Sequence, residues 1–274
     1  MATAFALVVV AFASVALHLF SPWWWTPIAS NWSYIDDTIN LTFLITGVVF
    51  TLIVLFMAYC VGRFRHQEGR KAVYEPESTR LEWGLTLVTA AGVAAMLIPG
   101  LFVWHQFITV PEGAAQVEVV GMQWRWSYRL PGNDGRLGTS DARHVTAENP
   151  LGINPADPNG QDDRVIEVDD LHLPIGKPVK LLLRSIDVIH NFYVPEFRAK
   201  MDFMPGLVTY VWLTPTRTGT FDALCAELCG TGHYVMRGKV VVETVEDYEK
   251  WLTEQRTFAQ SKAQTLAQAQ AQAK

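Results

Sequence analysis

Two long stretches without a charged side chain constrain the fold of this chain more than any other feature. Residues 38–60 contain no Asp, Glu, Lys or Arg, and in residues 85–107 the one titratable side chain is the imidazole of His105. As helices, both stretches are long enough to cross roughly 30 Å of hydrocarbon. We therefore predict a two-helix transmembrane anchor over residues 36–108.

The segment between the two apolar stretches carries a dense group of basic side chains, namely Arg63, Arg65, Arg70, Lys71 and Arg80. Because short loops rich in Lys and Arg stay on the cytoplasmic side of a membrane, we expect this segment in the cytoplasm. Everything after residue 111 then lies on the opposite side. The pattern predicts a multi-pass protein embedded in the lipid bilayer, with its large domain outside the cytoplasm. We expect the membrane to be a bacterial inner (plasma) membrane, with the domain on its periplasmic or outer side.

The first 25 residues allow two interpretations. Residues 1–20 form a third apolar run, which is followed by Trp23, Trp24 and Trp25. The length of the run and its small residues are typical of a secretory signal peptide, although no Lys or Arg precedes it. The three tryptophans could equally hold an additional transmembrane helix at the membrane interface. Both interpretations leave the large domain outside the cytoplasm.

After residue 111 the pattern changes to short segments in which apolar and polar residues alternate, which is typical of β-strands. These segments are residues 116–120, 124–130, 164–168, 179–184, 207–213, 220–224 and 239–243. They predict a β-sandwich or barrel over residues 112–252. Residues 131–163, rich in Gly, Pro, Asn and Asp, are expected to form a loop insertion. Residues 253–274 are expected to form a low-complexity tail, either a frayed helix or a disordered segment.

A group of metal-binding side chains lies near the C-terminus. Cys225, Cys229, His233 and Met236 fall within CAELCGTGHYVM, and His190 lies upstream in the strand-like SIDVIHNFYVP. Sulfur and imidazole suit copper and zinc, and a weak Met ligand beside Cys and His is characteristic of copper electron-transfer sites. Two thiolates can bridge two ions, leaving one His for each ion, with Met and a backbone carbonyl as outer ligands. The motif thus predicts a dicopper electron-transfer centre.

The same cysteines allow two simpler interpretations. A Cys-x3-Cys pair outside the cytoplasm can form a disulfide, which leaves His233 and Met236 without a role. Structural zinc uses two Cys and two His but has no need of the Met. Cys60, at the end of an apolar stretch, is expected to be an inert buried thiol. The net charge of −5 and the lack of a basic patch in the soluble part argue against nucleic acid as a partner.

In its longer motifs the sequence resembles subunit II of the haem-copper cytochrome c oxidases, over residues 37–252. The matching motifs occur in the family's order: DDTINLTFLI, LEWGLT, VVGMQWRWSY, LPIGKPV, SIDVIHNFYVP, KMDFMPG and CAELCGTGHYVM. The resemblance implies an α+β membrane protein, in which an N-terminal transmembrane helical hairpin is followed by a cupredoxin domain.

Six residues match the family's ligands for the dicopper CuA centre: His190, Cys225, Glu227, Cys229, His233 and Met236, with Glu227 binding through its backbone carbonyl. A side chain between two ligating cysteines can point away from copper while its carbonyl faces the metal. The Glu227 carboxylate matches the family's ligand for a magnesium ion at the boundary with subunit I. The implied cofactors are therefore two copper ions and Mg.

Four further residues match positions with other roles in the family. Trp124 matches the residue through which electrons arrive from cytochrome c. Asp187 and Asp202 match acidic positions near the docking surface and the copper site, where carboxylates would attract a lysine-rich cytochrome c. Glu82, at the cytoplasmic start of the second span, matches a residue at the mouth of a proton-uptake channel in subunit I.

Two positions depart from the family's pattern. Trp83 directly follows Glu82, whereas relatives more often place this Trp further on. Met122 precedes Gln123, where many relatives have His. The first departure weakens the match of Glu82, and the second touches none of the implied ligands.

The resemblance implies the electron-input subunit of an oxidoreductase, with cytochrome c as donor and subunits I and III as partners. Electrons would pass from the dicopper centre to haem in subunit I, where dioxygen is reduced to water with proton translocation. The spans offer no haem-ligating constellation, and no Cys-x-x-Cys-His motif for a c-type haem occurs. The alternative is the CuA-containing subunit of a related haem-copper reductase, such as a nitric-oxide reductase. A thioredoxin-like copper chaperone is disfavoured, because proteins of that class have no His-x2-Met motif, whereas this chain has one at His233 and Met236.

Overall fold

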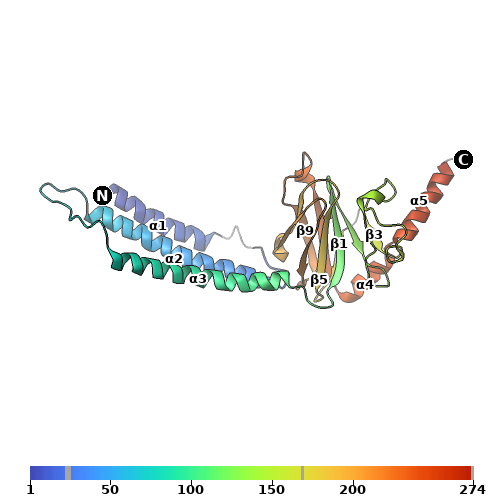
Figure 1. Cartoon of the computed structure of the whole chain (residues 1–274), viewed down its shortest axis with the longest axis horizontal. Helices are drawn as coiled ribbons and strands as arrows, with labels where there is room; N and C mark the ends of the chain where they lie inside the picture. Colours follow the sequence, from blue (N-terminus) through green and yellow to red (C-terminus); the bar gives the residue numbers. More distant parts are fainter. Residues whose placement is uncertain (22–25, 168–169, 273–274) are drawn as a thin grey trace. The chain divides into compact units, whose positions relative to one another are not determined.

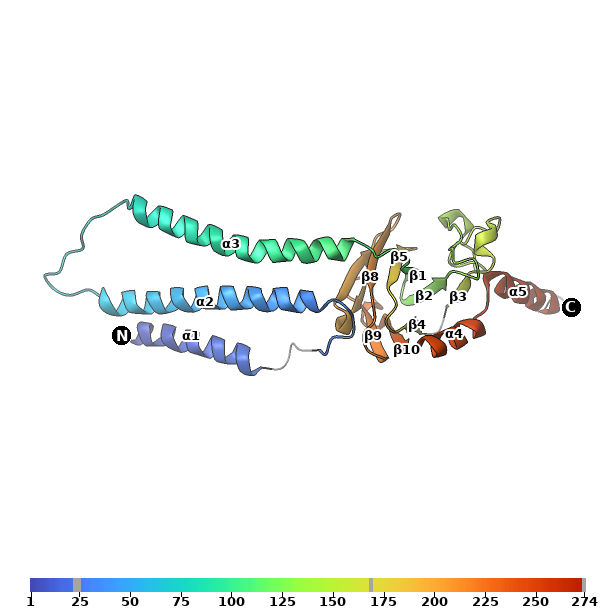
Figure 2. The ribbon, with the colours of Figure 1, turned by 90° about the horizontal axis from the view of Figure 1, so that it is seen from below.

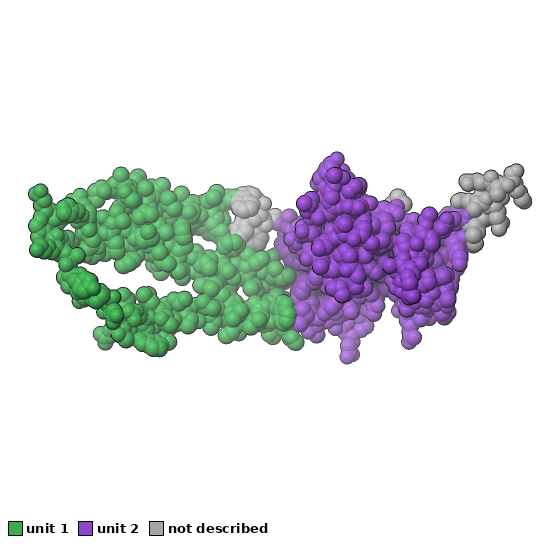
Figure 3. Space-filling model, turned by 45° about the horizontal axis from the view of Figure 1, so that its top comes forward, with its two compact units in different colours: residues 1–25, 34–105 green, residues 26–33, 106–274 purple. Residues whose placement is uncertain are grey.

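The computed structural model describes residues 1–21, 26–167 and 170–272, so Trp23, Trp24 and Trp25 lie outside the described set. The chain divides into two compact units, which Figure 3 colours separately. One comprises Met1–Trp25 and Tyr34–His105, and the other Thr26–Ser33 and Gln106–Lys274. The second unit therefore includes a short segment that precedes the transmembrane hairpin.

Long helices form the first unit: α1 (Ala2–Phe20), α2 (Ser33–Arg63) and α3 (Thr79–Ile108), shown in Figures 1 and 2. Each is able to cross a membrane by its length and composition. Many of their large apolar side chains are exposed, which suits helices surrounded by lipid. The hydroxyl of Thr42 donates to the carbonyl of Thr38 at 2.9 Å, so it needs no water. The predicted membrane-spanning helices are confirmed, and removal of α1 as a signal peptide stays a prediction.

The second unit is built on two five-stranded sheets within the described residues, with the orders β3-β2-β1-β5-β8 and β4-β10-β9-β6-β7 (Figure 1). The first sheet contains β1 (Ala115–Met122), β2 (Arg125–Leu130), β3 (Arg164–Ile166), β5 (Val179–Ser185) and β8 (Val208–Leu213). The second contains β4 (Leu171–Pro174), β6 (His190–Val194), β7 (Ala199–Phe203), β9 (Gly219–Cys225) and β10 (Arg237–Glu243). The predicted β-domain is confirmed. Strands β4 and β7 were not predicted: β4 has only four residues, whereas β7 was missed although its sequence, AKMDF, alternates apolar and polar residues.

The space between the sheets is filled by large aromatic side chains. The ring of Trp126 in β2 packs against Phe192 and Phe203 of the other sheet, at centroid distances of 5.7 and 5.2 Å. Gly121 in β1 lies opposite Trp126. A Cβ at Gly121 would lie 3.2 Å from the ring of His190 and 3.3 Å from the ring of Trp126. The core therefore extends up to the His190 side chain, and only glycine fits behind it without displacing a ring.

The outer face of the first sheet is covered by residues from the 131–163 insertion and by the start of the last helix. Val120 packs there against Leu151, Ile153 and Phe258, all of them buried. The insertion therefore contributes to a second, smaller core. The insertion contains two 3-10 turns, η1 (Ala142–His144) and η2 (Pro158–Gly160). After β10 the chain continues with the helices α4 (Val245–Glu254) and α5 (Phe258–Gln272).

Four charged side chains connect the insertion to the same outer face. Arg129 of β2 donates to the carboxylates of Glu118 and Asp163, both at 2.8 Å, and Arg184 of β5 donates to Glu118 at 2.9 Å. Burial alone would raise the pKa of Glu118, but the two guanidinium groups outweigh burial and lower it. Burial raises the pKa of Asp163 to about 6, because Arg129 offsets only part of the cost of desolvation.

Residues 26–33, which we name the N-terminal strap, lie against the β-domain although they precede α2. Ser30 forms a β-bridge with Pro215. The indole Nε1 of Trp32 donates to the carbonyl of Trp212 at 2.9 Å, and Trp32 is only 1% exposed. Its ring lies 4.7 Å from that of Trp212 and 5.0 Å from that of Phe107, between centroids. The β-domain predicted to begin at residue 112 therefore depends on residues far upstream.

Candidate metal centre

The loop between β9 and β10 carries most of the predicted copper ligands. Cys225 ends β9, and its N–H donates to the carbonyl of Met236 at 3.1 Å. His233 opens the turn η4 (His233–Val235), and its N–H donates to the carbonyl of Gly230 at 3.1 Å. Gly230 has a φ of 115°, a conformation that L side chains rarely adopt. The loop is closed by its own backbone, which holds its side chains in a fixed arrangement.

His190 comes from a neighbouring strand. It opens β6, which pairs with β9 so that Phe192 lies opposite Cys225. The His190 side chain is fully buried, with the rings of Trp126 and Phe203 at centroid distances of 6.2 and 6.5 Å. Because β6 and β9 are hydrogen-bonded neighbours, the fold itself brings this imidazole to the loop.

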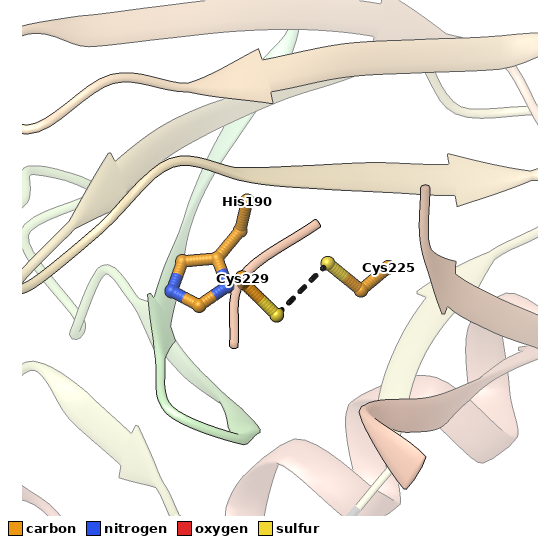
Figure 4. A group of neighbouring side chains, drawn as sticks. All are labelled: His190, Cys225 and Cys229. Atoms are coloured by element: carbon orange, nitrogen blue, oxygen red, sulfur yellow. Dashed lines mark hydrogen bonds between the residues drawn. The ribbon is translucent and has the colours of Figure 1, made fainter. Parts of the chain in front are cut away.

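The predicted ligands converge on the two thiols, as Figure 4 shows for three of them. The ligand atoms of His190, Cys225 and Cys229 all lie within 4.8 Å of one another. The two cysteines are free, with their Sγ atoms 3.7 Å apart, so they do not form the disulfide that their spacing allowed. The other donors surround this pair: His233 Nδ1 at 3.5 Å and Met236 Sδ at 3.8 Å from Cys229 Sγ, and the Glu227 carbonyl at 3.2 Å from Cys225 Sγ.

The spacing of the thiols fits bridged metal ions. Because a metal–thiolate bond is roughly 2.3 Å long, sulfurs 3.7 Å apart are close enough for one ion to bind both. The predicted donor set, with its thioether and carbonyl, exceeds the four ligands of a structural zinc site and suits copper.

His190 has one ring nitrogen available for a metal. Its Nε2 lies 2.8 Å from Asp187 Oδ1, while its buried Nδ1 has no hydrogen-bond partner among the described residues. Because an unpaired buried polar atom costs about 1–3 kcal/mol, a bound ion would relieve a real penalty here. Burial, together with the neighbouring Cys225, raises the pKa of the Cys229 thiol to about 12, so a metal must displace its proton.

Trp124 lies against the ligand loop. Its indole Nε1 donates to the carbonyl of Cys229 at 3.1 Å, and the residue is 38% exposed. A Cβ at Gly232 would lie only 2.3 to 2.7 Å from atoms of the indole, so a side chain there would displace it. Trp124 thus reaches from the surface to within one hydrogen bond of a predicted copper ligand, and its role in electron transfer stays a prediction.

The predicted acidic residues differ in their placement. Asp187 contacts His190, as described above, whereas Asp202 is exposed and its carboxylate accepts a hydrogen bond from Asn191 Nδ2 at 2.6 Å. The Glu227 side chain is exposed. Glu82 lies in the first turn of α3, which belongs to the other unit.

One residue of the site was missed by sequence reasoning. The backbone N–H of Gln123 donates to Asp187 Oδ2 at 2.7 Å, and its side-chain Nε2 donates to the carbonyl of Cys229 at 2.9 Å. Its position beside Trp124 was the only signal in the sequence. Its partners lie 64 and 106 residues away along the chain, which no local pattern reveals.

Comparison with known proteins gives consistent matches. Residues 115–245 match the family described as cytochrome C oxidase subunit II, periplasmic domain. The chain is 68% identical over 259 residues to the alternative cytochrome c oxidase subunit 2 of Bradyrhizobium diazoefficiens, covering 94% of each chain. It is 28% identical over 243 residues to cytochrome c oxidase subunit 2 of Cereibacter sphaeroides, covering 84% of this chain and 78% of that one.

Among solved structures, the periplasmic domain of subunit II of cytochrome oxidase from Bradyrhizobium japonicum matches at 26% identity with a TM-score of 0.40, covering 53% of this chain and 96% of that one. The family match, the oxidase relatives and the helices preceding a periplasmic domain agree with the family predicted from the motifs. Identity at the level of the first relative, over nearly the whole length, shows that the chain belongs to the family of cytochrome c oxidase subunit II.

Proposed function

We propose that this oxidase subunit accepts single electrons from a cytochrome c and passes them to the haem-bearing subunit I through two bound copper ions. The ions would be held by His190, Cys225, Cys229, His233, Met236 and the carbonyl of Glu227. The observation that carries the proposal is the convergence of two free thiols, 3.7 Å apart, with a buried imidazole whose Nδ1 has no hydrogen-bond partner within the described part of the chain. When bound, the copper pair supplies a one-electron redox centre.

The chain's residues prepare this site to keep its geometry when its charge changes. His190 and Met236 are at most 1% exposed and Cys229 is 2% exposed, so water is kept from these three ligands, whereas Cys225 and His233 are half-buried. The loop between β9 and β10 is fixed by its own backbone hydrogen bonds. Rigid ligands and a dry surrounding reduce the rearrangement that accompanies each electron transfer. This supports a role in moving electrons, with the chemistry on dioxygen carried out elsewhere in the oxidase.

Trp124 and the nearby carboxylates support electron input from a basic partner. The exposed edge of Trp124 leads through its indole N–H to the Cys229 carbonyl, and from there along covalent bonds to a thiolate. Asp187, with a side chain 28% exposed, lies beside this path, and Asp202 is exposed on β7, which β9 and β6 separate from β10 in the same sheet. Such carboxylates would steer a lysine-rich cytochrome c and speed its arrival at low salt.

Three further assignments follow from the family resemblance. The exposed Glu227 carboxylate would bind a magnesium ion shared with subunit I, on the side of the loop away from copper. Glu82 would lie at the entrance of a proton channel of subunit I, with subunit III completing the complex. The basic segment between α2 and α3 supports an inner-membrane protein whose copper domain lies in the periplasm.

The test of the electron path is rapid mixing of the oxidase with reduced cytochrome c. Trp124→Phe keeps an aromatic ring but removes the N–H that reaches Cys229, so the copper centre should be reduced more slowly while its absorption spectrum is unchanged. Tyr234→Phe, which alters an aromatic residue 77% exposed on the same loop, is the matched control and should react at the original rate. An unchanged rate in Trp124→Phe would refute the path.

A further inference from the structure

We infer that Asp187 and Gln123 are positioning residues of the copper centre: Asp187 fixes the ring of His190 with Nδ1 toward the thiols, and Gln123 fastens Asp187 to the ligand loop. The inference rests on the proposed function. Asp187 then has a structural role in addition to the docking role that the resemblance implies. Gln123, to which the sequence assigned no role, is a positioning residue as well.

The carboxylate of Asp187 is held by donors from two separate segments. Its Oδ1 lies 2.8 Å from His190 Nε2 and accepts the N–H of Val188 at 2.6 Å. Its Oδ2 accepts the N–H of Gln123 at 2.7 Å. A docking acid needs only an exposed charge, whereas both oxygens of this carboxylate are used inside the protein. Such contacts are typical of a carboxylate that orients a neighbouring side chain, here the imidazole of His190.

The contact between Asp187 and His190 decides which ring nitrogen meets the metal. In a histidine ligand, the hydrogen bond made by one ring nitrogen sets the tautomer and leaves the other to bind the ion. With Nε2 on Asp187, the remaining Nδ1 is buried and unpaired among the described residues. The ring has little room to turn over, because the Trp126 ring lies against it and even a Cβ added at Gly121 would come within 3.2 Å of the imidazole.

Gln123 connects this imidazole to the opposite side of the centre. Its backbone binds Asp187, and its side-chain Nε2 donates to the Cys229 carbonyl at 2.9 Å, the same oxygen that accepts the Trp124 indole N–H. A Cβ at Gly230 would lie 2.9 Å from the Gln123 amide, so glycine makes room for it. Contacts therefore run without a break from His190 through Asp187 and Gln123 to Cys229. They fix the separation of two predicted ligands from distant parts of the chain.

Two consequences follow for the loaded centre. A carboxylate on the outer nitrogen makes an imidazole a stronger donor, which favours the oxidised copper pair and lowers its reduction potential. Loss of such an outer partner typically weakens metal binding about 10- to 100-fold. A role in docking alone predicts neither effect, because docking concerns only the approach of cytochrome c.

The test is Asp187→Asn in the full chain within the purified oxidase. We expect a higher reduction potential for the copper pair and about 10- to 100-fold weaker copper binding, measured by equilibrium competition with a chelator. Asp222→Asn makes the same charge change at an acid 61% exposed, whose ion-pair partner is Lys239, and should leave both quantities unchanged. The inference is overturned if Asp187→Asn alters only the salt dependence of the reaction with cytochrome c.

Two further measurements keep the inference testable if that variant does not fold. Gln123→Met keeps the backbone donor to Asp187 and removes the amide, so copper should bind more weakly while the potential shifts less than in Asp187→Asn. In the unaltered, fully reduced protein, nitrogen-15 magnetic resonance should find the His190 proton on Nε2, and a proton on Nδ1 would overturn the inference. If the unaltered protein binds no copper, the proposed function fails, which is a distinguishable result.

Discussion

Replacing Trp32 by Ala should strongly destabilise the β-domain, although Trp32 precedes the transmembrane hairpin in sequence. The indole is 1% exposed, contacts the rings of Trp212 and Phe107, and donates to the Trp212 carbonyl at 2.9 Å. Truncating a buried Trp to Ala costs about 3–5 kcal/mol. The change also leaves the Trp212 carbonyl without this donor, which adds to the cost. Because domains are stable by only about 5–15 kcal/mol, this is a large part of the total.

The assay is guanidinium unfolding of the full chain in mild detergent, followed by near-ultraviolet circular dichroism. With a slope of about 4 kcal/mol per molar denaturant, a loss of about 4 kcal/mol lowers the midpoint by about 1 M. Leu207→Ala, at a side chain 63% exposed between β7 and β8, is the control and should shift the midpoint little. An unchanged midpoint for Trp32→Ala would show that the N-terminal strap is not part of the domain's core.

Two further predictions concern the ligand loop and the buried charges. Gly232→Ala places a Cβ within 2.3 to 2.7 Å of the indole of Trp124, so electron input from cytochrome c should slow as the indole is displaced, and an unchanged rate in rapid mixing would contradict this. Burial raises the pKa of Asp163 to about 6, so the folded state holds this proton more tightly than the unfolded chain. The stability it contributes is present below about pH 4 and is lost as pH rises through about 6. The unfolding midpoint of the unaltered chain, measured relative to that of Asp163→Asn, should therefore fall as pH rises from about 4 to about 6, and a difference that is constant with pH would contradict the assignment.

The candidate copper ligands could be recognised in the sequence because most of the metal-binding side chains lie close together along the chain. Cys225, Cys229, His233 and Met236 fall within one loop, and no simpler site uses all of them. The membrane spans were equally readable, since a long uncharged stretch has few alternatives in a folded protein. His190 could be predicted as a ligand only from the sequence motif around it. Its approach to the loop depends on the pairing of β6 with β9, which is not visible in the local sequence.

Contacts between distant segments were hidden from sequence reasoning. The N-terminal strap reaches the β-domain through bonds such as that between Trp32 and Trp212, which are 180 residues apart. Gln123 joins Asp187 to the ligand loop by the same kind of long-range contact. The 131–163 insertion has no periodicity, yet it supplies buried residues to the outer face of the first sheet. Patterns along the chain report which residues prefer to be buried, but they do not report their partners.

The central claim, that two thiolates of this chain bridge a pair of copper ions, is tested most directly on the purified full-length chain. Elemental analysis should find two copper ions per chain, and electron paramagnetic resonance of the oxidised centre should show one unpaired electron shared equally between two copper nuclei. Cys229→Ser, which removes one of the two sulfurs 3.7 Å apart, should abolish that shared signal. One copper ion per chain with a signal from a single nucleus, or zinc in place of copper, would contradict the account.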